Sequence, residues 1–272
     1  MIYPDSFEHK IGFSAVRTAV RALCKSQTAA SLCDGMRFSN DYASVSEALG
    51  RVAEMVSLIN SGDDVPLHNM RDIDRLLGPL AAEGTFLTAE ELSTLRKALT
   101  AMAEVSAFFS KRHDDEGHSD VPLLSAVASS LTTFRSVLDM IDRVLDPLGD
   151  VKDSASAELA QIRRSLSSMS GTINSVMRRV MANAVRDGII DSDTAPAMRD
   201  GRLVLPIQPM YKRKINGIVH DESSSGKTVF VEPAEVVEVN NRVRELQMEE
   251  RREIKRILVA TAAEIRPSVP DM

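Results

Sequence analysis

The segment Ser225–Thr228, Ser-Gly-Lys-Thr, has the residue types that end a phosphate-binding loop. A complete loop also needs a glycine five residues before Gly226, but Asp221 stands there, and its carboxylate would repel a phosphate. The residues that follow, Val229–Val231, have the composition of a strand, whereas such a loop must lead into a helix. We therefore expect no nucleotide site here and predict a flexible turn between strands with an exposed Lys227.

Two other segments carry reactive residue types. His113–His118 offers two imidazoles and three carboxylates within six residues, but a metal site needs rigid ligands and this stretch is typical of an exposed loop. His220, Asp221 and Ser223–Ser225 include all three residue types of a serine triad. Neighbouring residues rarely present that geometry, and no strand-turn-helix elbow surrounds them. We expect no catalytic residue, bound metal or cofactor in this chain.

The remaining candidates are basic. Lys212, Arg213 and Lys214 are consecutive, and Arg202 and Lys227 are nearby in sequence. Cations with few aromatic neighbours suit sequence-independent contact with a phosphate backbone. Composition alone leaves a solvated loop as an equal alternative.

Charge is unevenly distributed along the chain. The formal net charge is −6, yet the stretch from residue 160 to 230 holds eleven Lys and Arg against six Asp and Glu, a net +5. The rest of the chain therefore carries −11. This polarity can hold a basic working end away from an acidic body.

The composition favours a mainly helical protein. Hydrophobic residues make up 43% of the 272 residues, while aromatic residues make up only 4%. A core of Leu, Val, Ala, Met and Ile fits packed helices better than a β-sandwich. No apolar run approaches the roughly 20 residues that cross a bilayer, and the first 25 residues lack a signal segment. We expect a cytoplasmic protein without a membrane partner.

The first 150 residues predict a domain of short helices. The apolar period of Asp41–Ile59 places Val45, Leu49, Val52, Val56 and Ile59 on one stripe, with Ser39 or Asn40 as a cap. Thr88 and Glu91 have the spacing of a capping box. The other predicted helices are Ile11–Ser26, Ile73–Leu80, a helix from Thr88 to about Phe109, and Leu123–Leu145.

Beyond Asp150 the apolar pattern becomes a narrow seam. Its residues follow a 3, 4, 3, 4, 3, 4 spacing that is typical of a coiled coil: Leu159, Ile162, Leu166, Met169, Ile173, Val176 and Val180. A second seam, interrupted by Glu250, comprises Val236, Val239, Val243, Leu246, Ile254, Ile257 and Leu258. Two such helices are expected to pair antiparallel and to project roughly 40–50 Å.

Three short β-branched runs lie between the seams: Gly201–Ile207, Ile215–His220 and Thr228–Val231. Pro206 and Pro209 place the first run at a sheet edge. The predicted fold is mainly α, with a helical core or lever domain at 1–150. An antiparallel coiled-coil arm follows at 151–258, made of an outgoing helix 151–187, a β-tip 201–232 and a return helix 234–258. Residues 259–272 return into the core.

Two long motifs resemble a known family. Asp200–Ile207 and Gly217–Pro233 are similar to the clamp region of bacterial MutS-like proteins of the second type, the paralogues without mismatch recognition. Asn240-Asn241, Arg244–Leu246 and Glu249–Ile254 extend the similarity, as do Val151–Leu159 and Ile162–Arg164 upstream. The resemblance covers nearly the whole chain.

The resemblance implies a core, lever and clamp fold, and an N-terminal piece of a longer protein that ends before its ATPase domain. The longer protein would bind ATP and Mg, would be a homodimer, and often carries a small nuclease domain. It implies a non-catalytic clamp that handles double-stranded or branched DNA in the control of recombination, through Arg202, Lys212, Arg213, Lys214 and Lys227. The alternative is a docking arm for a protein or ribosome partner in the rescue of collided ribosomes, so the location would be nucleoid- or ribosome-associated. An independent enzyme is a third reading, which we do not expect.

Overall fold

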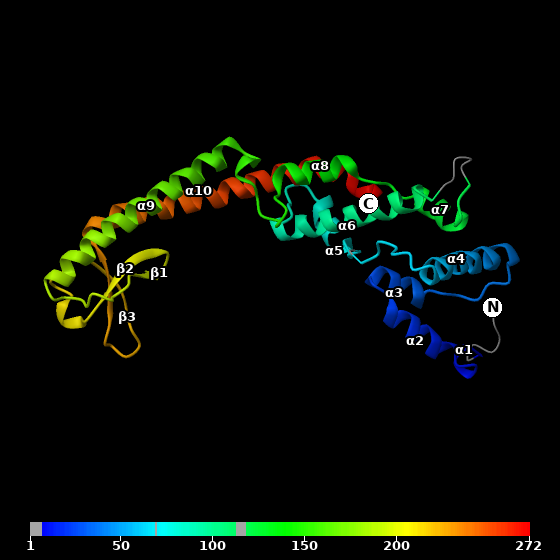
Figure 1. The fold of residues 1–272 in the computed structure, drawn as a ribbon, viewed down its shortest axis with the longest axis horizontal. Coiled ribbons are helices and arrows are strands. Elements are labelled where there is room, and N and C mark those ends of the chain that lie inside the picture. Colours follow the sequence, from blue (N-terminus) through cyan, green and yellow to red (C-terminus); the bar gives the residue numbers. More distant parts are fainter. Residues whose placement is uncertain (1–6, 69, 113–117) are drawn as a thin grey trace. The chain divides into compact units, whose positions relative to one another are not determined.

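The computed structural model describes residues 7–68, 70–112 and 118–272 and is mainly helical, with one four-stranded antiparallel sheet (Figure 1). Contacts divide the chain into two compact units. One comprises the residues up to Val151 together with Leu258–Met272, and the other comprises Lys152–Ile257. Among the described residues, no helix is both long and apolar enough to cross a membrane.

The first unit consists of short helices joined by polar turns. Thr88 and Glu91 form the predicted capping box at the start of one helix, which confirms its predicted start. Asp41 caps another helix by accepting a hydrogen bond from the Ser44 amide at 2.9 Å, in place of the predicted Ser39 or Asn40. The helices are α1 Phe7–Lys10, α2 Phe13–Leu23, α3 Gln27–Asp34, α4 Tyr42–Asn60, α5 Asp74–Ala81, α6 Ala89–Ser110, α7 Pro122–Ser129 and α8 Arg135–Val144.

The single helix predicted over Leu123–Leu145 is wrong, because α7 and α8 are separate. The chain leaves the helix after Ser129, where the hydroxyls of Ser129 and Ser130 bond back to the carbonyls of Ala126 and Val127. Such side-chain bonds compete with the helical backbone pattern. Two β-branched threonines, Thr132 and Thr133, follow after Leu131 and add to the break.

Helices α6 and α8 supply much of the core of this unit. Leu95, Leu99, Val137 and Ile141 are at most 1% exposed. A smaller apolar cluster joins α4, α6 and α7 through Leu58, Phe109, Val121 and Ala128. At the far end of the sequence, the Arg266 guanidinium donates to the Leu80 carbonyl at 3.0 Å and so ties the last residues to this unit.

The second unit is built on two long helices, α9 Ala157–Arg186 and α10 Ala234–Ile265, of which residues up to 257 belong to this unit. They run side by side and antiparallel (Figure 1). Ser156 donates to Glu253 at 2.6 Å, and Arg163 donates to Glu250 at 2.7 Å. Glu250 therefore faces α9 and forms an ion pair with it. In the sequence, the charge of Glu250 appeared to interrupt the apolar seam of the return helix.

The predicted seam of α9 holds at Leu159, Ile162, Ile173 and Val180, which are all buried. It differs at three positions: Leu166 and Met169 are only partly buried, and Met177, 1% exposed, takes the place predicted for Val176. Here α9 packs against both α10 and the sheet, so the buried face follows the 3.6-residue helical period and widens beyond a coiled-coil seam.

The sheet follows α9 and has the order β1-β2-β4-β3, with all pairs antiparallel. Its strands are β1 Ala197–Arg199, β2 Arg202–Ile207, β3 Gly217–Glu222 and β4 Val229–Pro233. The sequence did not predict β1. Asp200 and Gly201 join β1 to β2, and both have positive φ (48° and 75°), as a two-residue hairpin turn of the mirror-image type requires.

The prediction that Pro206 lies on an edge strand is wrong, since β2 has neighbours on both sides. Strand β1 pairs only with Arg202–Val204, however, and stops before Pro206. Pro206 pairs with Phe230 of β4. The missing amide of Pro206 therefore removes no bond to β1.

One apolar cluster joins the sheet to the two helices. From the sheet come Leu205, Ile207, Val229 and Val231, and from the helices Ile173, Met177, Val180, Ala184 and Val236. All are buried. The cluster fixes the sheet beside the C-terminal part of α9 and the N-terminal part of α10.

Candidate functional site

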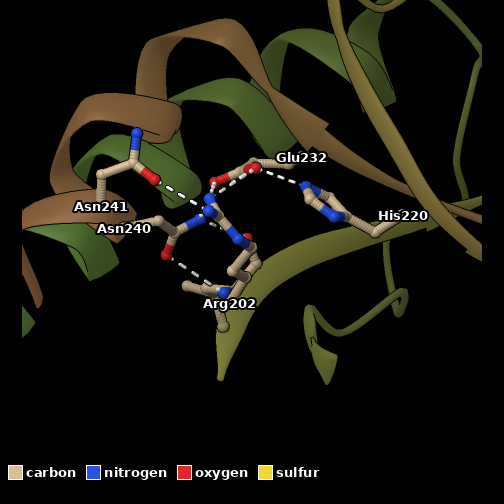
Figure 2. Close-up of polar contacts among 6 residues, drawn as sticks. Arg202, His220, Glu232, Asn240 and Asn241 are labelled. Atoms are coloured by element: carbon tan, nitrogen blue, oxygen red, sulfur yellow. Dashed lines mark hydrogen bonds and ion pairs between the residues drawn. The ribbon is translucent and has the colours of Figure 1, made fainter. Parts of the chain in front are cut away.

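A buried carboxylate lies at the centre of the second unit. Glu232 on β4 has a fully buried side chain (0% exposed). The Arg202 guanidinium donates from Nη1 to both of its oxygens, at 2.8 and 3.0 Å. His220 on β3 places Nε2 2.5 Å from Oε2 of the same carboxylate (Figure 2). Three strands therefore meet at one charged group.

Helix α10 completes this polar cluster. The Asn240 amide donates to Glu232 at 2.7 Å, and it also exchanges two bonds of 3.1 Å with the backbone of Leu203 on β2. Asn241 accepts a bond from Arg202 at 2.8 Å. Figure 2 shows these side chains converging from α10 and the sheet. We call Arg202, His220, Glu232, Asn240 and Asn241 the polar cluster.

Local backbone geometry aims the His220 side chain. The pairing of β3 with β4 shifts between Val219 and Asp221, so His220 is the extra residue of a β-bulge. A bulge re-aims a side chain that would otherwise alternate across the sheet. Gly217 at the start of β3 lies against β4, where a Cβ atom would collide with the carbonyl of Glu232. A side chain at position 217 would therefore push the two strands apart.

The polar cluster holds Glu232 ionised. Burial by itself would raise the pKa of this carboxyl, but hydrogen bonds from Asn240, His220 and Arg202 and the Arg202 charge outweigh burial, so the pKa lies below its usual range. All three partner residues, Arg202, His220 and Asn240, come from different elements than Glu232. The arrangement therefore links the three strands to α10 and is suited to holding the sheet in place.

The predicted basic residues fall into two groups. Arg202 is only 16% exposed and is engaged by Glu232 and Asn241. Lys212, Arg213 and Lys214 are exposed, in the turn that follows the short 3-10 helix Pro209–Tyr211. Arg202 stands at the opposite end of β2 from this turn, roughly 16 Å away along the strand. The structure therefore does not bring Arg202 together with the three consecutive cations.

Lys227 lies at the same end of the sheet as the basic turn, because Ile207 of β2 pairs with Val229 of β4. It is exposed in the turn between β3 and β4, where the Gly226 amide donates to the Ser223 carbonyl at 2.7 Å. The adjacent Thr228 lines a hollow of about 250 Å³ together with Tyr211 and Asp191. Over the described residues, no carboxylate lies within ion-pairing distance of Lys212, Arg213, Lys214 or Lys227. The Lys214 ammonium lies 5.2 Å from the Tyr211 ring centre. We call these four residues the exposed basic tip.

Sequence reasoning missed a second group of cations. Arg244 and Arg251 lie on α10 with Gln247 between them, and they line a hollow of about 380 Å³ beside the Asp200-Gly201 turn. Both are exposed, and within the described part of the chain neither makes an ion pair. The i, i+3, i+7 spacing, which puts all three on one helix face, was the signal available in the sequence.

The structure also bears on the three other candidate sites considered from the sequence: the phosphate-binding loop, the serine triad and the metal site. Strand β4, and not a helix, follows Thr228, as predicted. His220 contacts Glu232, while Ser223 bonds to Thr228 within its own turn. The stretch 113–117 lies outside the described residues; among those described, no group of three His, Cys, Asp or Glu side chains could hold a metal ion.

The chain is similar to several curated proteins. No family model matches it. It is 35% identical over 239 residues to Endonuclease MutS2 of Ligilactobacillus salivarius (87% of this chain, 29% of the relative). It is 32% identical over 249 residues to Endonuclease MutS2 of Thermomicrobium roseum (90% and 30%), and 31% identical over 250 residues to that of Exiguobacterium sibiricum (90% and 31%).

These matches make the chain a relative of the MutS2 proteins and confirm the resemblance to MutS-like proteins of the second type. The chain spans between a quarter and a third of the length of the relatives it matches. The matched stretch includes the helical unit and the unit that carries the polar cluster, since it covers about 90% of the chain.

Proposed function

We propose that the chain is the core and clamp region of a longer MutS-like protein, and that residues 152–257 form a non-catalytic clamp that contacts DNA. The observation that carries the proposal is the exposed basic tip: Lys212, Arg213, Lys214 and Lys227 are exposed and have no ion-pair partner among the described residues, on a chain whose net charge is −6. Unpaired cations on an acidic protein are suited to phosphate contacts made by releasing counterions.

Two other arginines of the second unit are paired inside the sheet, which distinguishes them from the exposed basic tip. Arg199 lies 3.3 Å from Asp221 and stacks over the Phe230 ring at 4.0 Å. Arg202 is held by Glu232. These two arginines stabilise the sheet, so we propose that Arg202 has a structural role in the sheet and that phosphate contact falls to the four residues of the tip. Arg244 and Arg251 would extend the contact along α10.

The names of the relatives support the link to nucleic acid. They are named endonucleases, and the described part of this chain offers neither a metal-ligand cluster nor a completed triad. We propose that the nuclease activity, ATP with Mg, and dimer formation belong to other parts of a longer protein. We further propose a nucleoid-associated, cytoplasmic location. We also propose that α9 and α10 form a coiled coil, in which the two helices supercoil around each other.

The test is DNA binding by the 272-residue chain, measured by fluorescence anisotropy with duplex and four-way-junction probes. The triple change Lys212→Glu, Arg213→Glu, Lys214→Glu should weaken binding at least about tenfold. The matched control changes Lys97, Arg135 and Arg143 of the first unit to Glu; these are exposed and alter the net charge equally. Equal affinity of the tip variant and the wild type would overturn the site assignment.

In the alternative function, docking to a ribosome, the same exposed cations would contact the partner. Photo-crosslinking in cells distinguishes this function from DNA binding. A photo-crosslinker placed at position 227 should yield protein–DNA adducts in cells if the clamp contacts DNA. Adducts confined to ribosomal RNA or ribosomal proteins would favour the docking arm.

A further inference from the structure

A hollow in the second unit opens beside the exposed basic tip. Its lining comes from residues 188–191 and Thr194 between α9 and β1, from residues 206–208 at the end of β2, and from Tyr211 and Thr228. The volume is about 250 Å³, which is that of roughly eight water molecules in the liquid. The hollow is therefore large enough for one small planar group.

The end of α9 fixes one wall of this hollow. Gly188 has a φ of 66°, and its amide donates to the Val185 carbonyl at 3.0 Å. The Ile189 amide donates to the Ala184 carbonyl at 2.9 Å. These two bonds form the Schellman pattern of a helix C-terminus, in which glycine takes the left-handed conformation. Ile189 and Ala184 are both buried in the apolar cluster of the sheet and helices, so the backbone that leads to Asp191 is held in place.

The lining combines apolar surface with polar groups that are free to bind. Ile190, Pro206 and Ile207 supply the apolar part. Five polar side chains of the lining make no hydrogen bond within the described part of the chain: Asp191, Thr194, Gln208, Tyr211 and Thr228. Ligand sites typically pair an apolar wall with a few such polar groups, which fix the orientation of the ligand. The hollow therefore suits a ligand with an apolar face and a polar edge.

The distribution of charge narrows the choice of ligand. Among the described residues that line the hollow, Asp191 alone carries a carboxylate, so the interior repels phosphate and offers a metal ion a single acidic ligand. Cations stand at the rim, since Lys212 follows Tyr211 and Lys227 precedes Thr228 in the sequence. A fitting ligand is therefore uncharged, carries N–H donors for the carboxylate, and is attached to phosphates that the rim can bind. A nucleobase in a DNA strand meets all three conditions.

We propose that this hollow binds one unpaired base of a DNA strand whose phosphates lie on the exposed basic tip, an inference that rests on the proposed DNA contact. Proteins that hold an unstacked base bind its edge by hydrogen bonds and its face by aromatic or apolar side chains. Asp191 accepts hydrogen bonds from the base, and Ile190 and Pro206 pack against its face. Guanine suits Asp191 best, because its Watson–Crick edge carries adjacent N–H donors. Extruding a paired base costs free energy, so the clamp selects DNA in which a base is already unpaired.

Fluorescence anisotropy of the 272-residue chain tests the proposal with a continuous duplex and with the same duplex carrying one bulged guanine. The wild type should bind the bulged probe at least about tenfold more tightly. Asp191→Asn should lower this ratio of affinities at least about threefold, because an N–H donor then faces the donors of the base. Gln208→Ala is a second, independent variant of the lining and should also lower the ratio. Both side chains are exposed, so the fold should survive, and circular dichroism verifies this.

Asp193→Asn is the matched control, because Asp193 is exposed, lies in the same segment and does not line the hollow. It removes the same charge and should raise the affinity for both probes alike, which leaves the ratio unchanged. A third probe, whose bulged nucleotide has no base, should bind like the continuous duplex.

Two kinds of failure can be told apart. A wild-type ratio near one, or a ratio that Asp191→Asn leaves unchanged, would overturn the base site. DNA contact by the tip would still hold in that case if the Lys212→Glu, Arg213→Glu, Lys214→Glu variant loses affinity for both probes. Unchanged affinity of that triple variant would overturn the proposed function and the base site together.

Discussion

The guanidinium of Arg202 lies 2.8 and 3.0 Å from the two oxygens of Glu232, thirty residues away in the chain and fully buried. This pair joins β2 to β4, and through Asn240 and Asn241 it also joins both strands to α10. The orientation of the sheet against the helix pair therefore depends on a few charged and polar contacts as well as on the apolar cluster.

Removing the buried carboxylate should destabilise the second unit. Glu232→Ala leaves the Arg202 charge largely buried and unpaired, and we expect the free energy of unfolding to fall by about 3 kcal/mol. Urea denaturation followed by circular dichroism measures the change. Glu238→Ala, an exposed position on α10, is the control and should stay within about 0.5 kcal/mol of the wild type. A Glu232→Ala variant as stable as Glu238→Ala would contradict the role of the cluster.

The same carboxylate should make stability depend on pH. The pKa of Glu232 is lower in the folded chain than its ordinary value of 4.5, because the bonds from Asn240, His220 and Arg202 outweigh the effect of burial. Its contribution is therefore fully present above pH 4.5 and is lost as the pH falls through the folded-state pKa. The stability difference between the wild type and Glu232→Gln should shrink below pH 4.5. A difference that is constant from pH 7 to about pH 3 would show that the carboxylate is not held ionised.

Contact between the two long helices can be measured at one ion pair. Arg163 on α9 donates to Glu250 on α10 at 2.7 Å, and about a quarter of each side chain is exposed. Solvent screening lowers the interaction energy of such a partly exposed ion pair. A double-mutant cycle of Arg163→Ala and Glu250→Ala should therefore give a coupling energy of about 1 kcal/mol. The exposed Arg164, combined with Glu250 in the same kind of cycle, should show a coupling near zero. Equal couplings for both arginines would place Glu250 away from α9.

The arginines that line the α10 hollow should contribute to DNA affinity if the clamp extends along the helix. Arg244→Ala with Arg251→Ala removes two cations that make no ion pair within the described part of the chain, and we expect affinity to fall about three- to tenfold. Arg242→Ala is the control, since Arg242 already pairs with Glu245 at 3.0 Å and Glu249 at 3.4 Å. If Arg242→Ala lowered DNA affinity as much as the double variant, the net charge of the chain would explain the loss and a local contact at Arg244 and Arg251 would be contradicted.

Local signals in the sequence located most elements. Thr88 with Glu91 marked the start of α6, and Asp200-Gly201 lies at the turn into a predicted strand. The sequence missed β1, which has only three residues and is stabilised through its pairing with β2. It joined α7 to α8 because the apolar period continues across the serines that end α7.

The sequence pattern could not predict contacts between residues that lie far apart in the chain. Arg202 was assigned to the basic surface because nothing near it in sequence shows that Glu232 and Asn241 lie beside it. The sequence predicted the apolar stripe of α4 (Val45, Leu49, Val52, Val56 and Ile59), but periodicity does not tell whether a helix face is covered, and these side chains are exposed. Glu250 looked like an interruption because its partner Arg163 lies 87 residues earlier.

The salt dependence of DNA binding tests the central claim most directly. Each phosphate contact adds about 0.9 to the slope of the logarithm of the association constant against the logarithm of salt concentration. Changing Lys212, Arg213 and Lys214 to Ala should therefore lower the magnitude of the slope by about 2 to 3 relative to the wild type. Changing Lys97, Arg135 and Arg143 to Ala should leave the slope unchanged. Identical slopes for the tip variant and the wild type would contradict the account.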